Sequence, residues 1–176
     1  MKRFASILLS FTIAALSVNP VRAQSNAAAE RAADDRAAAA FEQLKSLAGE
    51  WHGQGPHGLT RVSYQIVSGG MAVMETIIPP NEPTMVTLYH RDGDQLMMTH
   101  YCSGGNQPRM RAEAPAGEIK NLNFAFVDVT NLTKPTDGHM QKHALSFQDQ
   151  DHITSVWTWR QDGKDTPSTF ILARKK

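Results

Sequence analysis

The chain is poor in cysteine and in clustered charge, and both absences narrow what it can be. Cys102 is the only cysteine among 176 residues, so an internal disulfide is excluded and stability must come from a hydrophobic core or from an oligomer. The 18 lysines and arginines nearly balance the 17 aspartates and glutamates, and the main basic cluster is residues 174–176. Because nucleic-acid binding depends on gathered positive charge, we expect no nucleic-acid partner.

Long apolar runs are also scarce, and the longest lies at the start of the chain. Lys2 and Arg3 precede an apolar run over residues 4–18, and the small residue Ala23 follows shortly afterwards. This pattern predicts a secretory signal peptide over residues 1–23. The run is shorter than the roughly 20 apolar residues of a membrane span, and no second run follows. We therefore expect a periplasmic or secreted protein with no integral membrane segment after processing.

Two helical stretches are predicted ahead of the main domain. Residues 24–40 are rich in alanine with interspersed charges, which favours helix by propensity but offers no large apolar face, so a frayed helix or a tether is predicted there. Phe41, Leu44 and Leu47 then recur every three residues. That spacing predicts a short amphipathic helix that lies against the rest of the domain, which we assign to residues 41–176.

The remainder of the chain has the periodicity of strands. Runs such as RVSYQIV, MAVMETI and HITSVWTW alternate in polarity and are separated by Gly-Gly, Pro-Pro and Asp-Gly turn signals. The pattern predicts about ten strands and no second helical block. Many antiparallel strands in sequence after one short helix favour an all-β, up-and-down barrel, because closure removes exposed sheet edges. A β-sandwich is the alternative.

Two segments resemble known families. In LAGEWHG a short helix runs into Gly49 and Trp51, and Arg174 lies near the end of the last strand. Together they resemble the signature of the calycin superfamily, the lipocalins and fatty-acid-binding proteins. The resemblance implies a calycin-like barrel in which Trp51 closes the floor and Arg174 stacks over it. The longer segment MVTLYHRDGDQLMMTHYCSGGNQPRM resembles a family of exported bacterial lipocalin-like domains of unknown function.

Hairpin turns place the candidate site residues on one face of a strand pair. Asp-Gly at residues 92–93 and again at 162–163 predicts two-residue turns, and the first of these pairs Met85 with His100. One face of that hairpin then carries Met85, Thr87, Tyr89, Leu96, Met98, His100 and Cys102. The opposite face is also largely apolar. We expect the barrel interior to cover one face and the N-terminal helix or a second copy of the chain, in a homodimer, to cover the other.

His100 and Cys102 are the central candidates for chemistry. Residues two apart on a strand point the same way about 6 to 7 Å apart, so these two could share a ligand, a metal or a proton. The alternative is a hydrogen-bonded histidine at a strand end beside a small buried cysteine. A Cys-His nucleophile is disfavoured, because no third residue orients the base and nothing in the sequence lowers the thiol pKa.

A second histidine pair tests the metal interpretation. His139 and His143 would share one face of a helix, but Asp137 and Gly138 precede them and the following residues alternate in polarity. This predicts a strand, in which the two imidazoles lie about 13 Å apart and cannot bind one metal together. We therefore predict no multi-residue metal site. Haem ligation by a single histidine remains an alternative.

The segment GGNQPR at residues 104–109 predicts a turn rather than a phosphate loop, because it has neither a lysine nor a following helix. Within it, Arg109 is a candidate to hold a carboxylate at the barrel mouth.

The sequence thus predicts an exported barrel that binds a small, largely apolar molecule. The predicted ligand contacts are His100, Cys102, Tyr89, Met85, Met98, Arg109 and Asn106. The alternatives are an isomerase or hydrolase with His100 as general base, and a barrel that carries haem or a metal.

Overall fold

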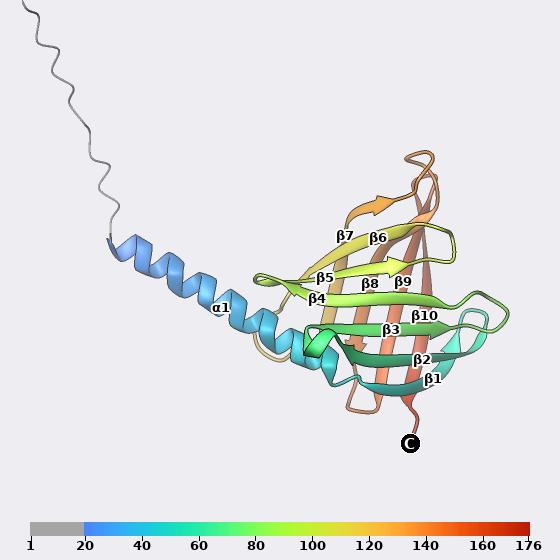
Figure 1. Cartoon of the computed structure of the whole chain (residues 1–176), viewed down its shortest axis with the longest axis horizontal. Helices are drawn as coiled ribbons and strands as arrows, with labels where there is room; N and C mark the ends of the chain where they lie inside the picture. The colour runs from blue at the N-terminus through green and yellow to red at the C-terminus, as the bar shows by residue number, and fades with distance from the viewer. Residues whose placement is uncertain (1–19) are drawn as a thin grey trace, which may run out of the picture.

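The computed structural model describes residues 20–176, which form one long helix and a closed β-barrel (Figure 1). The elements are α1 (Pro20–Lys45), β1 (Gly49–Gly55), β2 (Gly58–Val67), the short 3-10 helix η1 (Ser68–Gly70), β3 (Ala72–Ile78), β4 (Met85–Asp92), β5 (Gln95–Tyr101), β6 (Gln107–Glu113), β7 (Asn121–Thr130), β8 (His139–Phe147), β9 (His152–Gln161) and β10 (Lys164–Arg174). The predicted signal peptide lies almost entirely outside the described residues.

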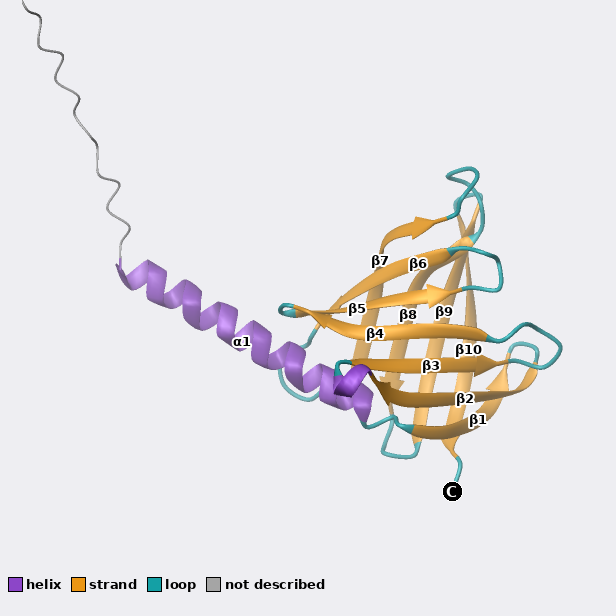
Figure 2. Ribbon diagram, viewed as in Figure 1, coloured by secondary structure: helices purple, strands orange, loops and turns teal. Residues whose placement is uncertain are grey.

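The barrel has the simplest antiparallel order. Each strand pairs with its neighbour in the chain, and β10 pairs with β1 to close the sheet (Figure 2). Closure leaves no unpaired edge strand among the ten. The predicted all-β, up-and-down barrel of about ten strands is confirmed, and the β-sandwich alternative is wrong.

Glycine permits the closing contact between the first and last strands. A Cβ atom added at Gly53 of β1 would lie 1.8 Å from the carbonyl oxygen of Ile171 in β10. No side chain fits at that distance, so the two backbones approach closely only because residue 53 is glycine. Glycine is therefore required at position 53 of the seam.

The helix α1 is continuous from Pro20 to Lys45, so residues 24–40 are helical and join the predicted amphipathic stretch without a break. Its C-terminal third buries Ala37, Phe41 and Leu44 at one end of the barrel, and the rest projects away from the barrel (Figure 1). No helix among residues 20–176 has both the length and the apolar character that crossing a bilayer requires.

The helix-covered end is closed by an aromatic ring and a cation. Trp51 is only 1 % exposed, and the Arg174 guanidinium carbon lies 4.3 Å from the centre of its ring. The indole Nε1 donates to the carbonyl of Leu47 at 2.8 Å, and Arg174 donates to the carbonyls of Ser46 and Ala48. The predicted stacking of Arg174 on Trp51 is confirmed by this geometry, which also ties the end of the helix to the first and last strands.

The register of the β4–β5 hairpin differs from the prediction. Asp92 pairs with Gln95 and Thr87 pairs with His100, so the turn is Gly93-Asp94 rather than Asp92-Gly93. Gly93 has φ +59° and Asp94 does not have a positive φ, which is the pattern of a turn with glycine at its first central position. The cross-strand partner of each residue therefore differs from the prediction by two positions. Side chains alternate with a period of two along a strand, so every side chain keeps the predicted face. The second turn, at 162–163, is confirmed by the pairing of Gln161 with Lys164.

The outer face of this hairpin is covered only in part. The helix α1 packs against β2, β4 and β5 at the closed end, where Asp34 forms an ion pair with Arg91. Further along, Leu88 and Met97 are half-buried and Tyr101 is 48 % exposed. The N-terminal helix therefore covers this face only near the closed end of the barrel, so the prediction that it covers the face is met in part. The homodimer stays a prediction.

Candidate functional site

A pocket of about 470 Å³ opens at the end of the barrel opposite α1. The β1–β2 turn contributes Pro56 and His57 to its rim, the β3–β4 loop contributes Glu82, and the β5–β6 loop contributes Ser103 and Gly104. These loops lie at the end of the barrel that is farthest from α1 (Figure 1). The barrel therefore has one closed end and one end with an open pocket.

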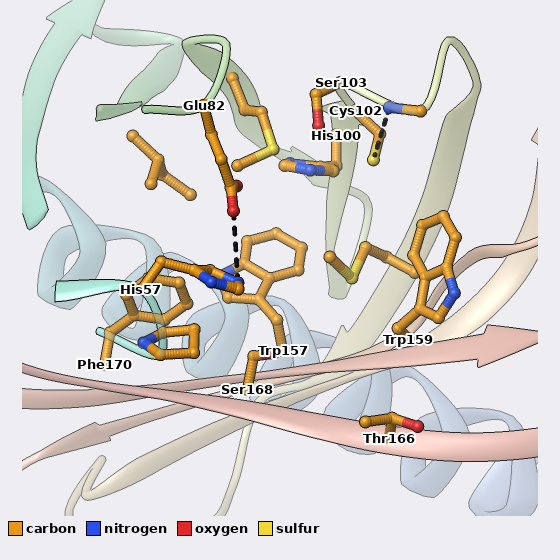
Figure 3. Close-up of a pocket in the computed structure, with 15 residues that line it drawn as sticks. His57, Glu82, His100, Cys102, Ser103, Trp157, Trp159, Thr166, Ser168 and Phe170 are labelled. Atoms are coloured by element: carbon orange, nitrogen blue, oxygen red, sulfur yellow. Dashed lines mark hydrogen bonds and ion pairs between the residues drawn. The ribbon is translucent and has the colours of Figure 1, made fainter. Parts of the chain in front are cut away.

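His100 lies in the wall of this pocket and presents an unpaired nitrogen. The residue is 1 % exposed, and its ring projects toward the space enclosed by the lining residues (Figure 3). The Nδ1 atom is 2.9 Å from the hydroxyl oxygen of Thr87, its cross-strand neighbour, whereas Nε2 has no hydrogen-bond partner among residues 20–176. Burial lowers the pKa of His100 to about 4, so the imidazole is neutral at physiological pH.

Trp157 stands between two buried histidines. Its ring centre is 4.4 Å from that of His100 and 4.0 Å from that of His143, which stacks on it nearly in parallel. His143 contacts the Ser155 hydroxyl through Nε2 at 3.0 Å, and burial and the nearby His100 lower its pKa to about 3. The indole Nε1 of Trp157 also lacks a partner in the described part of the chain. The pocket is therefore bordered by a neutral aromatic stack in which three polar atoms, His100 Nε2, His143 Nδ1 and Trp157 Nε1, have no partner in the described part of the chain.

The remaining walls are mostly apolar. Ile77, Met85, Met140 and Phe170 line the pocket together with Trp157. Such a lining suits an apolar molecule, and the methionines can adapt to its shape. Of the two methionines predicted to contact the ligand, Met85 lines this pocket, where Met140 joins it, and Met98 does not.

Two contacts shape the mouth. His57 Nε2 and Glu82 Oε1 lie 3.2 Å apart across it, and both side chains are substantially exposed (Figure 3). Trp159 forms another part of the rim and packs directly on Gly138, where an added Cβ would lie 2.0 Å from the Trp159 Cζ2 atom. The glycine therefore makes room for the ring.

Cys102 also lines the pocket, just beyond the end of β5. The backbone N–H of Gly104 donates to its sulfur at 3.4 Å. Burial is the largest influence and raises the pKa of the thiol, so Cys102 is protonated at neutral pH and is a poor nucleophile. The geometry agrees with the sequence-based argument against a Cys-His nucleophile.

A buried carboxyl group lies next to this site, and the sequence analysis missed it. Glu75 is 1 % exposed, with the hydroxyl of Tyr64 donating to Oε1 and that of Tyr89 donating to Oε2, each at 2.8 Å. The sequence did contain a sign of this buried carboxyl group. In MAVMETI, Glu75 lies on the same strand face as Val73 and Ile77, and that face must point into the apolar interior. A charged residue at such a position needs partners, and these partners are the two tyrosines.

The structure brings some of the predicted ligand contacts together and separates others. Met85, His100 and Cys102 line the pocket. Tyr89 and Met98 face the same interior but lie fully buried below it, Tyr89 against Glu75.

The two residues predicted from the turn at 104–109 do not reach the pocket. Asn106 is buried and donates through Nδ2 to the carbonyl of Gly138 at 2.8 Å, so it fastens the β5–β6 loop to the start of β8. Arg109 points outward from β6 and binds Asp128 of β7 with both ends of its guanidinium group. The prediction that Arg109 holds a carboxylate at the mouth is not supported, because side chains alternate along β6 and this one faces the outside.

Among residues 20–176 no three or more histidine, cysteine, aspartate or glutamate side chains are grouped as metal ligands would be. His139 and His143 both lie on β8, as predicted, and they bind different partners: His139 contacts the Asp137 carbonyl and His143 contacts Ser155.

Comparison with known proteins informs the fold but not the chemistry. No protein-family model matches the sequence, and no curated protein matches it either. Among solved structures, the chain is similar to Rv2717c from M. tuberculosis, with a TM-score of 0.53 and 15 % sequence identity over 78 % of this chain and 98 % of that chain. At this level of identity the similarity supports the barrel fold alone.

Proposed function

We propose that the protein binds a small, largely apolar molecule in the open end of its barrel, as an exported carrier or scavenger of the calycin type. One observation carries the proposal: the Nε2 atom of His100 is buried without a partner in the wall of an otherwise apolar pocket of about 470 Å³. A buried polar atom of this kind is costly unless something binds it, and ligand pockets typically combine apolar walls with a few polar groups that fix orientation.

A fluorescent apolar amine, N-phenyl-1-naphthylamine, is a suitable probe, since its emission rises when it enters an apolar site and its N–H can donate to His100. We expect saturable binding to the wild-type protein. His100→Leu should leave folding nearly intact and weaken binding by about 1 to 3 kcal/mol, the cost of an unmade hydrogen bond, or roughly 5- to 150-fold in Kd. His52→Leu is the matched control, because His52 is an exposed histidine on the outside of β1.

Cys102 reports where the probe binds. It is the only cysteine of the chain and it lines the pocket, so modification by N-ethylmaleimide is confined to this site. Bound probe should slow that modification in proportion to occupancy. Binding that leaves the modification rate of Cys102 unchanged would place the probe elsewhere and contradict the proposal. A Soret absorption band in protein purified from its native host would indicate a haem-binding barrel instead.

A further inference from the structure

Four polar side chains form one row across adjacent strands of the barrel wall. Tyr64 on β2 is paired in register with Glu75 on β3, Glu75 with Thr87 on β4, and Thr87 with His100 on β5. All four are buried. Because directly opposed residues in an antiparallel sheet have Cβ atoms about 5 Å apart, their side chains meet in sequence along the row. The row leads from the closed end of the barrel to the pocket.

Two contacts along the row are short. Tyr64 donates to Glu75 at 2.8 Å, and the Thr87 hydroxyl oxygen is 2.9 Å from His100 Nδ1. Between these two contacts, Thr87 lies directly opposite Glu75 in the pairing of β3 with β4. Burial is the largest influence on Glu75 and raises its pKa, and the hydroxyl groups of Tyr89, Tyr64 and Thr87 oppose that effect. Glu75 forms no ion pair with any lysine, arginine or histidine of residues 20–176. The carboxyl group is thus held by hydroxyl groups alone.

A hydroxyl group between an imidazole and a carboxyl group can be oriented in two ways. When Glu75 is ionised, Thr87 donates to it and must accept from His100, whose proton is then on Nδ1 and whose Nε2 presents a lone pair to the pocket. When Glu75 is protonated, it donates to Thr87, Thr87 donates to Nδ1, and the proton of His100 is on Nε2. The imidazole is neutral in both arrangements.

We propose that Glu75, Thr87 and His100 form a proton relay that gives the pocket a proton acceptor without charging the buried imidazole. A ligand X–H transfers its proton to His100 Nε2, the Nδ1 proton passes to the Thr87 oxygen, and the Thr87 proton passes to Glu75. The X–H bond breaks, one O–H bond forms on the carboxylate, and the negative charge moves from Glu75 to the ligand. Glu75 is the positioning residue that receives the proton, and His100 is the group that contacts the ligand.

The relay specifies a class of ligand, and this step rests on the proposed function. The ligand must be apolar enough for the walls formed by Met85 and Phe170 and must carry one acidic O–H group, as a phenol or an enol does. After transfer its oxygen accepts a hydrogen bond from His100 Nε2–H. The unpartnered indole N–H of Trp157 is a second donor in the same lining. An ether or a hydrocarbon of the same shape has no proton to transfer.

Other titratable groups face this row, and none replaces Glu75 as the acceptor. Burial raises the pKa of Tyr64 and of Tyr89 well above the usual value, so both remain protonated donors. Burial lowers the pKa of His143 to about 3, so it remains neutral. At the mouth, His57 and Glu82 pair with each other across the opening.

The relay is tested directly by ¹⁵N NMR of the histidine ring nitrogens across a pH titration of the ligand-free protein. In the wild type, His100 should change from the Nε2–H tautomer at low pH to the Nδ1–H tautomer at higher pH with no imidazolium between them. Thr87→Val keeps the shape but removes the hydroxyl, and Glu75→Gln removes the titration. In both variants the tautomer should not depend on pH over the range of the wild-type transition.

Ser155→Ala is the matched control, since it removes the hydroxyl partner of His143 instead, and it should leave the transition of His100 unchanged. A single wild-type tautomer at every pH, a transition that passes through imidazolium, or a transition that survives in Thr87→Val would each overturn the relay.

Calorimetric binding of 1-naphthol and 1-methoxynaphthalene tests the ligand class. At a pH where His100 is in the Nδ1–H form, the wild type should bind the naphthol at least about tenfold more tightly than the ether, and Thr87→Val should reduce this preference to less than about threefold. Equal affinity for both compounds, in a protein that shows the tautomer transition, would overturn the ligand class and leave the relay standing. Absence of binding by these compounds and by N-phenyl-1-naphthylamine would overturn the proposed function and the ligand class together.

Discussion

Glu75 shows how one buried polar residue organises the barrel interior. The hydroxyl groups of Tyr64 and Tyr89 donate to its two oxygens, and Thr87 lies opposite it in the strand pairing. Removing one donor leaves a buried carboxyl group less well satisfied, which costs more than losing an exposed contact. The inner wall therefore depends on specific hydroxyl groups as well as on apolar packing.

Tyr64→Phe tests this dependence. We expect a loss of about 1 to 3 kcal/mol in the free energy of unfolding, the range for a buried polar group left unsatisfied, measured by urea denaturation at neutral pH. The control is Tyr101→Phe, because Tyr101 is 48 % exposed and the change should cost less than about 0.5 kcal/mol. Equal losses in both variants would mean that the Tyr64 hydroxyl does not stabilise Glu75.

The site was partly predictable at the scale of single residues. The alternation of side chains along residues 85–102 predicts that His100 and Met85 face inward, and both do. The neighbours of His100 across the barrel, Trp157 and His143, could not be predicted in the same way. They belong to β9 and β8, and which distant strands face one another depends on the number of strands and their tilt rather than on local pattern.

At the scale of elements, the closed end joins the helix to the seam of the barrel. Arg174 at the end of β10 donates to carbonyls of the segment that connects α1 to β1 and also to that of Gln150 in the β8–β9 turn. Trp51 fills the space beneath it and contacts Tyr64 edge-on. The resemblance of the motif at Gly49 and Trp51 to the calycin signature implied this stacking of Arg174 on Trp51.

Trp51→Ala should therefore destabilise the protein by about 3 to 5 kcal/mol, the usual cost of emptying a large buried aromatic site, measured by chemical denaturation. Trp159→Ala is a suitable comparison, because that ring lies at the rim of the open end and is only partly buried. The rim substitution should cost clearly less and should alter ligand binding instead. The assignment of Trp51 to the barrel floor would be lost if both substitutions had the same effect on stability.

The turns show where local pattern is sufficient and where it is not. Asp-Gly at 162–163 forms the predicted turn, with Asp162 at φ +50° and Gly163 at φ +74°. The same dipeptide at 92–93 forms a turn shifted by one residue, because glycine there occupies the first central position. Both turn types suit the twist of a hairpin and differ little in energy. The dipeptide thus predicts a hairpin reliably and its register less so.

At the scale of the whole molecule, the helix projects from the closed end, away from the loops that contribute the rim residues of the pocket (Figure 1). If the predicted signal peptide is removed after Ala23, the helix loses its first four residues and keeps the buried contacts of Phe41 and Leu44. Mass analysis of exported protein should therefore find Gln24 as the first residue. Exported protein that retains Met1 would contradict both the processing and the assignment to the periplasm or the exterior.

The two buried histidines make the stability of the molecule depend on pH. In the unfolded chain both have pKa values near the ordinary 6.5, whereas in the fold these fall to about 4 for His100 and about 3 for His143. Below pH 6.5 the unfolded state therefore binds protons that the folded state does not, and stability is lost as the pH falls toward 4. The raised pKa of Glu75 acts in the opposite direction, because there the folded state binds the proton more tightly.

His143→Phe separates these contributions, because phenylalanine keeps the ring against Trp157 and cannot be protonated. The free energy of unfolding should be measured from pH 7 to pH 4 in the wild type and the variant. Between pH 7 and pH 4 the free energy of unfolding should fall by on the order of 3 kcal/mol more in the wild type than in the variant, because each unit of pKa difference corresponds to about 1.4 kcal/mol. Glu75 contributes equally to both proteins, so its effect cancels in this comparison. His52→Phe, at an exposed histidine, should keep the wild-type slope. Parallel pH profiles for the wild type and His143→Phe would show that His143 takes up a proton as readily in the folded barrel as in the unfolded chain, and would contradict the lowered pKa.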